Sequence, residues 1–304
     1  FNFIFLIGIV FSLPRYSLQE ATSCMSCHVN PTGSGMRNDY GSNIYSLEEL
    51  PLERYVSEGD EDWDGYITNN VQLGGDFRVQ AFKDGEDTKI FPMQADVYAN
   101  IDINKKANLY FKVDLSRHLS DEYFVLFEDI FQNTWMKIGQ SLPNYGLRID
   151  DHTSFIRGGN VNSIFSGNDT EYDEGLFFDV SKESPILMEW GTKFNSTYLT
   201  FGMANNYISN NSLDGIINLS SSINSYYQID DLSILTGISF MKESNIKSYS
   251  FFGGFSIEKY SFLFEMDKVE NWIQDLNSYA TMIQMTYEPI QGFYLLAKYD
   301  YFDR

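Results

Sequence analysis

The stretch that decides the fold of this chain is Met93–Ile103, which reads MQADVYANIDI. Apolar side chains stand at every second position, and polar side chains such as Gln94 and Asp96 stand between them. A period of two places successive side chains on opposite faces of a β-strand. The pattern therefore predicts a strand with one apolar and one polar face.

The same alternation recurs along the chain, in about thirteen segments of roughly 9–13 residues each. Strands of soluble sandwiches are nearer five or six residues, whereas a tilted membrane strand needs about 9–11. We therefore expect an all-β fold, a transmembrane antiparallel up-and-down β-barrel over residues 67–304. The alternative is a soluble β-sandwich or β-helix. The clearest further examples are Val71–Ala81, Leu109–Leu115, Tyr249–Ile257, Tyr260–Met266 and Phe293–Tyr301.

The connections between these segments predict the topology. Tight turns are expected at Asn104–Lys106, Asn195–Ser196, Asp230–Asp231, Glu258–Lys259 and Pro289–Gly292. They alternate with longer stretches at Lys83–Pro92, Asn206–Asp214 and Glu270–Leu276. Outer-membrane barrels have short periplasmic turns and longer extracellular loops.

Two further features bear on the barrel rims. The long connection Ser141–Glu171 is expected on the short-turn rim, unless Tyr123–Ile130 forms an extra strand, which would move it to the other rim. The tryptophans Trp135, Trp190 and Trp272 are expected in aromatic girdles near the strand ends.

Composition limits the class of protein. The net charge of −21 argues against a nucleic-acid partner. Aromatic residues make up 16% of the chain. No run of about 20 apolar residues occurs, so no transmembrane helix is expected. A membrane barrel lacks such runs because its lipid-facing and lumen-facing residues alternate.

The only two cysteines lie in the run Cys24-Met25-Ser26-Cys27-His28. This C-x-x-C-H pattern is the attachment signature of a c-type haem. Cys24 and Cys27 would form the thioether bonds, and His28 would ligate the iron, so one covalent haem c is the expected cofactor. A redox dithiol or half of a zinc site is the alternative. A zinc site needs two more ligands, and a thioredoxin-like site needs a βαβ context.

The haem segment is short, because only about 40 residues separate Cys24 from the first strand, too few for an ordinary globular cytochrome. Either the barrel lumen or a partner protein must therefore cover the haem. Met36 and His152 are equal candidates for the sixth iron ligand, His118 is the other histidine, and five-coordinate iron stays open. In the long loop, Arg148 could lie near the haem propionates; a salt-bridged constriction loop is the favoured alternative.

The two ends of the chain carry further expectations. The apolar stretch Phe1–Phe11 predicts a signal peptide remnant over residues 1–21. Residues 22–66 would form the c-type haem-binding segment. Because thirteen strands is an odd number and no closing strand ends the chain, the barrel is expected to be incomplete at the C-terminus and the chain truncated at both ends.

A signal, one C-x-x-C-H and an aromatic-rich barrel together resemble the fused monohaem cytochrome c–porins of bacterial outer membranes, whose best-known members are iron oxidases. The resemblance rests on Cys24, Cys27 and His28, the Pro/Gly-rich segment up to Gly41 and the barrel pattern from Asn70 onward. The run Leu142–Arg148 also looks like that of porin-type barrels. The sequence around the haem motif departs from the iron-oxidase signature, which leaves the substrate open.

The resemblance implies an outer-membrane electron-transfer protein or oxidoreductase. It would pass electrons between an extracellular donor or acceptor, iron among them, and periplasmic cytochromes, with the lipid bilayer around it and no nucleic acid involved. One alternative is a diffusion porin whose haem is a structural or sensory plug. Another is a barrel scaffold for a separate multihaem cytochrome.

Overall fold

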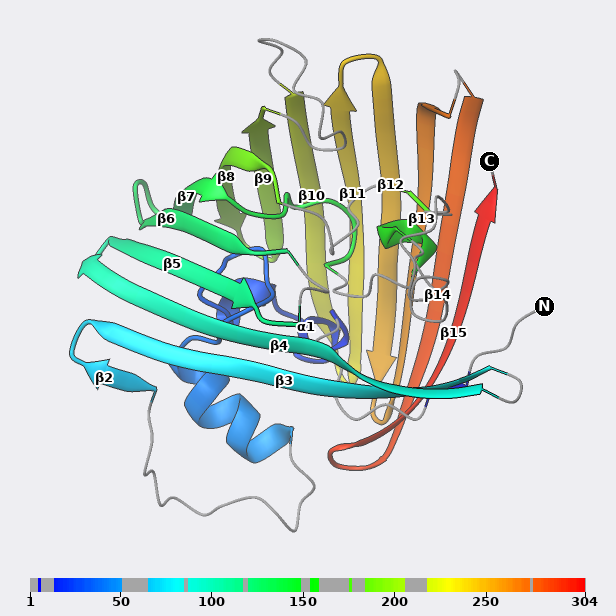
Figure 1. The fold of residues 1–304 in the computed structure, drawn as a ribbon, viewed down its shortest axis with the longest axis horizontal. Helices are drawn as coiled ribbons and strands as arrows, with labels where there is room; N and C mark the ends of the chain where they lie inside the picture. Colours follow the sequence, from blue (N-terminus) through cyan, green and yellow to red (C-terminus); the bar gives the residue numbers. More distant parts are fainter. Residues whose placement is uncertain are drawn as a thin grey trace.

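The computed structural model describes residues 5–6, 14–50, 65–84, 87–116, 120–148, 154–158, 175–176, 184–205, 218–273 and 276–303. One large antiparallel sheet dominates it (Figure 1). The helical segments are α1 (Arg15–Gln19), η1 (Cys24–Ser26), η2 (Tyr40–Glu49) and η4 (Phe155–Arg157). The first strands are β1 (Phe5–Leu6), β2 (Tyr66–Thr68), β3 (Val71–Asp84), β4 (Asp87–Asn104), β5 (Ala107–Asp114), β6 (Glu122–Glu128) and β7 (Thr134–Gln140). The others are β8 (Ile186–Phe194), β9 (Thr197–Ala204), β10 (Asn218–Ile229), β11 (Leu232–Glu243), β12 (Ile246–Ile257), β13 (Tyr260–Ile273), β14 (Leu276–Ile290) and β15 (Phe293–Asp303). Helix α1 lies inside the curve of the sheet, and η2 lies below β2 and β3 (Figure 1).

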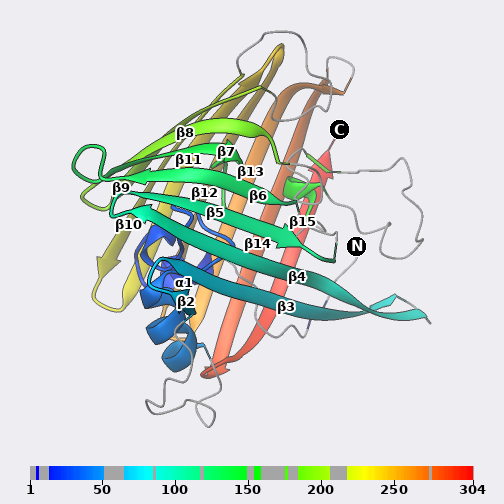
Figure 2. The same cartoon turned by 60° about the vertical axis from the view of Figure 1, so that its left-hand side comes forward.

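The strands follow one another around the sheet in chain order. From β2 to β15 each strand pairs antiparallel with the next, and β1 adds to the outer edge of β15. In the described residues β2 and β1 form the two edges, and the sheet curves around a lumen without closing (Figures 1 and 2). The all-β up-and-down architecture predicted from the sequence is confirmed.

Burial along the strands is the reverse of that in a soluble protein. In β13, Glu265 is fully buried while its neighbour Met266 is 46% exposed, and in β4 Asp96 is buried while Val97 is exposed. Polar side chains thus line the lumen and apolar side chains form the outer face. An exposed apolar face of this extent requires an apolar solvent, which a lipid bilayer supplies.

The predicted short turns all lie at one rim, and exposed aromatic side chains surround them. Each turn joins the strands on either side of it, from β4–β5 to β14–β15. The prediction for Trp135 is wrong, because this side chain is buried in the lumen against Tyr110 and Phe124. The exposed aromatics beside the short turns are Phe131, Phe194, Tyr227, Tyr260 and Phe293.

Two of the predicted long loops are strand extensions instead. Within Lys83–Pro92, Asp84 pairs with Asp87, and within Glu270–Leu276, Ile273 pairs with Leu276. Beyond the lipid, a hairpin can carry polar side chains on both faces, so the apolar alternation ends before the strand does. The third predicted loop, Asn206–Asp214, lies outside the described residues.

The long connection after β7 begins at the rim opposite the short turns. The extra strand considered over Tyr123–Ile130 exists as β6. One added strand moves every later connection to the opposite rim. Placing Ser141–Glu171 on the short-turn rim is therefore wrong. The described parts of this connection nevertheless fold back into the lumen, where Leu147 and Ile156 are buried.

The N-terminal segment fills the lumen. Helix α1 packs against β11, β12 and β13, and its Leu18 is fully buried in the main apolar cluster of the interior. The segment that follows α1 lies inside the curved sheet in both views (Figures 1 and 2). Part of the predicted signal region thus packs inside the barrel, and the division at residue 21 stays a prediction.

Within the part of the chain that the structure describes, no helix is both long and apolar enough to cross a membrane.

A charge on the outer face tests the membrane assignment. Ile238 lies outward in the middle of β11, and Ile257 lies outward at the short-turn end of β12. We expect Ile238→Arg to lower the free energy of unfolding by about 2–4 kcal/mol and the matched Ile257→Arg by about 0–1 kcal/mol, because the penalty depends on depth in the bilayer. Urea unfolding from lipid vesicles measures both values. Equal effects of the two substitutions would contradict the assignment.

Candidate haem site in the barrel lumen

A single tight turn brings the three residues of the C-x-x-C-H motif together. The backbone N–H groups of Cys27 and His28 both donate to the carbonyl of Cys24, at 3.1 and 3.0 Å. Cys24 and Cys27 form no disulfide, and the two cysteines and His28 line one cavity inside the barrel. The turn therefore presents two sulfur atoms and one imidazole to the same space. The rest of that cavity is lined mainly by Pro14, Tyr16, Glu20, Ser34, Arg37, Tyr45, Leu50 and Arg148.

The chain then doubles back beside the motif. The N–H of Val29 donates to the carbonyl of Met36 at 3.0 Å, and the N–H of Asn38 donates to the carbonyl of Cys27 at 3.0 Å. The Pro/Gly-rich run that the sequence predicts to be irregular lies between Val29 and Met36. We call the folded-back segment Val29–Gly41 the bracket. These two hydrogen bonds hold the backbone in place on either side of His28.

Two glycines are needed where the bracket closes on the cysteines. Gly33 has φ +91°, and a Cβ placed there would lie 3.0 Å from both Cβ and Sγ of Cys24. A Cβ at Gly41 would lie 2.1 Å from the carbonyl oxygen of Cys27, which is backbone and cannot move aside. The segment can therefore approach the motif only because these positions lack side chains.

Buried polar side chains of the barrel wall hold the segment in place. Lys137 donates to Asn30 Oδ1 at 3.3 Å and to Thr32 Oγ1 at 2.9 Å, and its charge pairs with Glu189 at 2.9 Å. The N–H of Met36 donates to the Tyr110 hydroxyl at 3.0 Å. The wall therefore supplies the partners that a segment of this length cannot supply for itself.

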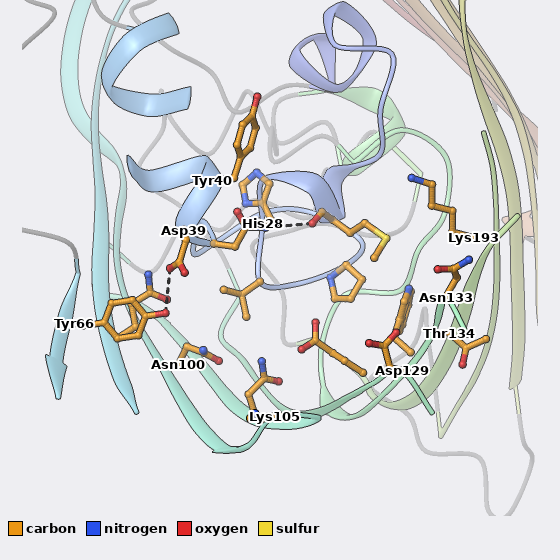
Figure 3. A pocket seen from close by; sticks show the side chains of 18 residues that line it. His28, Asp39, Tyr40, Tyr66, Asn100, Lys105, Asp129, Asn133, Thr134 and Lys193 are labelled. Carbon is orange, nitrogen blue, oxygen red and sulfur yellow. Dashed lines mark hydrogen bonds between the residues drawn. The ribbon is translucent and has the colours of Figure 1, made fainter. Parts of the chain in front are cut away.

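His28 also borders a second cavity, of about 570 Å³, at the short-turn rim (Figure 3). Asp39, whose carboxylate accepts from Tyr66 at 3.0 Å, lies at one side of it. The barrel contributes residues of the short turns or of adjacent strand ends, among them Lys105, Asp129, Asn133 and Lys193. The imidazole thus lies between the cysteine-lined cavity and the mouth of the barrel.

The candidate sixth ligands are placed as follows. Met36 is buried against Tyr98, Tyr110 and Trp135 and lines neither of the cavities that His28 lines. His118 and His152 lie outside the described residues. The identity of the sixth ligand stays a prediction.

The Leu142–Arg148 run is a lumen segment bonded to the inner wall. The side-chain oxygen atoms of Glu122, Glu189, Ser239 and Glu265 accept hydrogen bonds from its backbone N–H groups. The Arg157 guanidinium donates to two of its carbonyl groups and pairs with Glu265 at 2.9 Å. Residues 149–153, which hold most of the expected salt-bridged constriction loop, lie outside the described residues, so that expectation stays a prediction. The last residue of the run, Arg148, also reaches the cysteine-lined cavity.

Burial and local charge shift two titratable groups beside the motif. Burial, with smaller contributions from Cys24 and Glu20, raises the pKa of Cys27 to about 11, while Arg37 opposes the rise. Burial and the nearby Glu49 carboxylate raise the pKa of Glu20. In the haem-free chain, burial therefore disfavours the charged form of each group.

Sequence reasoning missed the wall residues that hold the segment. Lys137, Glu122 and Tyr110 stand on lumen-facing positions, and the period-two pattern identifies such positions without saying what each side chain contacts. Pairing across the lumen joins residues about a hundred positions apart, as in Lys137 with Asn30. The one signal in the sequence was that Lys137 is a lysine at a lumen-facing position of a mostly apolar strand.

Comparisons with known proteins give structures but no sequence family. No family model matches the chain, and no curated protein matches it. Among solved structures, the chain is similar to OmpF of Salmonella typhi (TM-score 0.46, 12% identity), covering 77% of this chain and 79% of that one. It is also similar to the anion-selective porin of Comamonas acidovorans (TM-score 0.44, 13% identity, 77% and 78% covered). A third is OccK5 (OpdH) of Pseudomonas aeruginosa (TM-score 0.41, 11% identity, 79% and 73% covered).

These similarities are low, so the class of the protein rests on its own strand pairing and burial. The antiparallel up-and-down sheet, its apolar outer face and its polar lumen are those of an outer-membrane β-barrel with a porin-like fold. Such barrels lie in the outer membrane, with the lipid bilayer around the apolar face.

Replacing one glycine tests the packing of the bracket. Gly41→Ala would place a methyl group against the Cys27 carbonyl, so we expect Cys27 and His28 to shift and the midpoint of thermal unfolding to fall by several degrees. Gly74→Ala is the matched control, because its Cβ would meet the nearest atom at 3.5 Å, an ordinary contact. Circular dichroism in detergent follows both. An unchanged midpoint for Gly41→Ala would contradict the packing.

The raised pKa of Cys27 predicts slow alkylation of the haem-free protein. The thiolate is the reactive form, so at pH 8 a pKa of about 11 instead of 9.0 leaves roughly a hundredfold less of it. Iodoacetamide labelling, followed by mass spectrometry in a Cys24→Ala background, should accelerate with pH up to about 11. The same chain in urea serves as control and should react as an ordinary thiol. A folded-state midpoint near 9.0 would show that Cys27 is not buried in this way.

Proposed function

We propose that this chain is an outer-membrane monohaem cytochrome–porin, an electron-transfer protein that carries one covalent haem c in its lumen. It passes electrons between an extracellular donor or acceptor, iron among the candidates, and periplasmic cytochromes. The observation that carries the proposal is that Cys24, Cys27 and His28 line one cavity inside the barrel.

The residues present fit a c-type haem. Two thiols that form no disulfide and an imidazole, all within one short turn, are the donor set that covalent attachment and proximal ligation require. Gly33 packs directly against the Cys24 side chain, where a Cβ would lie 3.0 Å from Sγ. Haem, when bound, supplies one-electron exchange at its iron.

The chain's own residues supply attachment, orientation and shielding. Cys24 and Cys27 would tether the group, and His28 would ligate the iron. Tyr16, Tyr45 and Leu50 contribute apolar surface to the same cavity. A less polar site strengthens the electrostatic interactions between the cavity walls and any charge that changes there.

The location of His28 supports electron exchange at the periplasmic side. His28 borders the cavity at the short-turn rim, and short turns are periplasmic in such barrels. The apolar band of a barrel is about 25 Å tall, and one haem spans only part of it. The extracellular donor or acceptor must therefore enter the lumen from the opposite rim.

A diffusion porin is the second candidate, favoured by the polar lumen wall. Against it, α1, the haem segment and the Leu142–Arg148 run occupy the interior and are bonded to the wall. In that case the haem would be a structural or sensory plug. A barrel that scaffolds a separate multihaem cytochrome is the third reading, and co-purification of such a protein would support it.

Covalent haem is the direct test of the proposal. Produced with a c-type maturation system and purified in detergent, the protein should be red, and its haem should stay with the polypeptide in denaturing gels. Cys24→Ala and Cys27→Ala together should abolish this, with Gly74→Ala as a matched variant that retains it. A colourless wild-type protein would contradict the proposal.

Electron exchange separates the candidate functions. In intact cells, a membrane-impermeant redox reagent should oxidise or reduce the haem of the wild-type protein. Ion conductance across planar bilayers without such exchange would support the diffusion porin instead.

A further inference from the structure

Arg148 lies where the lumen segment meets the haem segment. It lines the same cavity as Cys24, Cys27 and His28. A Cβ placed on Gly33 would lie 3.0 Å from Cys24 Sγ and 3.6 Å from Arg148 Cγ, so the arginine side chain passes close to the first cysteine. A residue from the long connection thus contributes directly to the wall of the candidate haem cavity.

Arg148 belongs to a buried group of charges that also contains Glu122 and Lys112. Its Nη2 atom lies 2.9 Å from Glu122 Oε1, and Lys112 Nζ lies 3.6 Å from the same oxygen. The three side chains are 11%, 1% and 2% exposed in the order Arg148, Glu122, Lys112. Two cations therefore share one carboxylate. Because the group is buried, solvent and salt screen it weakly.

The other charges near the cavity largely offset one another. Arg37 and Glu20 line it as an opposite pair. On the wall behind the segment, Lys137 is paired with Glu189 at 2.9 Å. Of the Arg148–Glu122–Lys112 group, Arg148 is the member that lines the cavity of the motif.

We propose that Arg148 raises the reduction potential of the haem held by Cys24, Cys27 and His28. The inference rests on the proposed function, because it requires that haem. Loss of one electron from the ferrous iron adds one positive charge to the site, and a buried positive neighbour opposes that change. The electron itself goes to the external acceptor, and Arg148 neither ligates the iron nor changes its own charge.

Three substitutions test how the charges of Arg148 and Glu122 affect the midpoint potential of the haem. Arg148→Gln removes the positive charge and should lower the midpoint potential. Arg148→Lys keeps the charge and should restore most of the wild-type value. Glu122→Gln removes the negative charge and should raise the potential. Arg78→Gln is the matched control and should leave it unchanged, since Arg78 faces inward beside Asp76 and lines no part of this cavity.

Spectroelectrochemical titration of the purified holoprotein, with soluble mediators exchanging the electron, measures all four variants. Opposite shifts for Arg148→Gln and Glu122→Gln support the inference. Equal falls in both would overturn it, because looser packing that admits water lowers the potential whichever charge is lost. An unmoved potential in Arg148→Gln would also overturn it. Each of these results leaves the proposed function standing, whereas a wild-type protein without haem defeats the proposed function itself.

Discussion

The structure depends on where a membrane-embedded sheet can place its polar side chains. In lipid, the outer face of the sheet must be apolar, so charged and amide side chains such as Gln94, Asp96 and Glu265 turn into the lumen. That lumen is then lined with groups that need partners. Asn30 and Thr32 of the haem segment, and the backbone N–H groups of the Leu142–Arg148 run, supply those partners.

The interior charges are therefore structural as well as electrostatic. Lys137 and Glu189 form a buried pair, as do Arg157 and Glu265. Removing one member of such a pair typically costs about 3–5 kcal/mol, because the other charge stays buried without compensation. The segment around Asn30 and Thr32 is hydrogen-bonded to one of these charges, Lys137. The barrel wall thus supplies the packing partners that this short segment lacks.

The sequence predicts some levels of this structure well and others poorly. Alternation in stretches such as Met93–Ile103 gave strand type, face and chain-order topology, because these follow from local periodicity. The motif at Cys24–His28 gave the candidate site for the same local reason. Strand ends were misjudged at Lys83–Pro92, since polar hairpins beyond the lipid carry no alternating signal. Trp135 was assigned to the wrong face because residue type was weighed above position in the strand.

Long-range pairing lay beyond the sequence. The contacts of Lys137 with Thr32 and of Arg148 with Glu122 join distant parts of the chain, and nothing local specifies them. The connection Ser141–Glu171 was predicted at the wrong rim because a single extra strand, β6, moves every later connection to the other rim. The fold was thus predictable as a pattern, and the interior of the candidate site was not.

An experimental structure of the matured protein in a lipid nanodisc would show whether the lumen holds the haem. We expect density for one haem inside the barrel, bonded to Cys24 and Cys27, with His28 between it and the short-turn mouth. Haem density outside the sheet, or a lumen from which the Cys24–Gly41 segment has been withdrawn, would contradict this expectation.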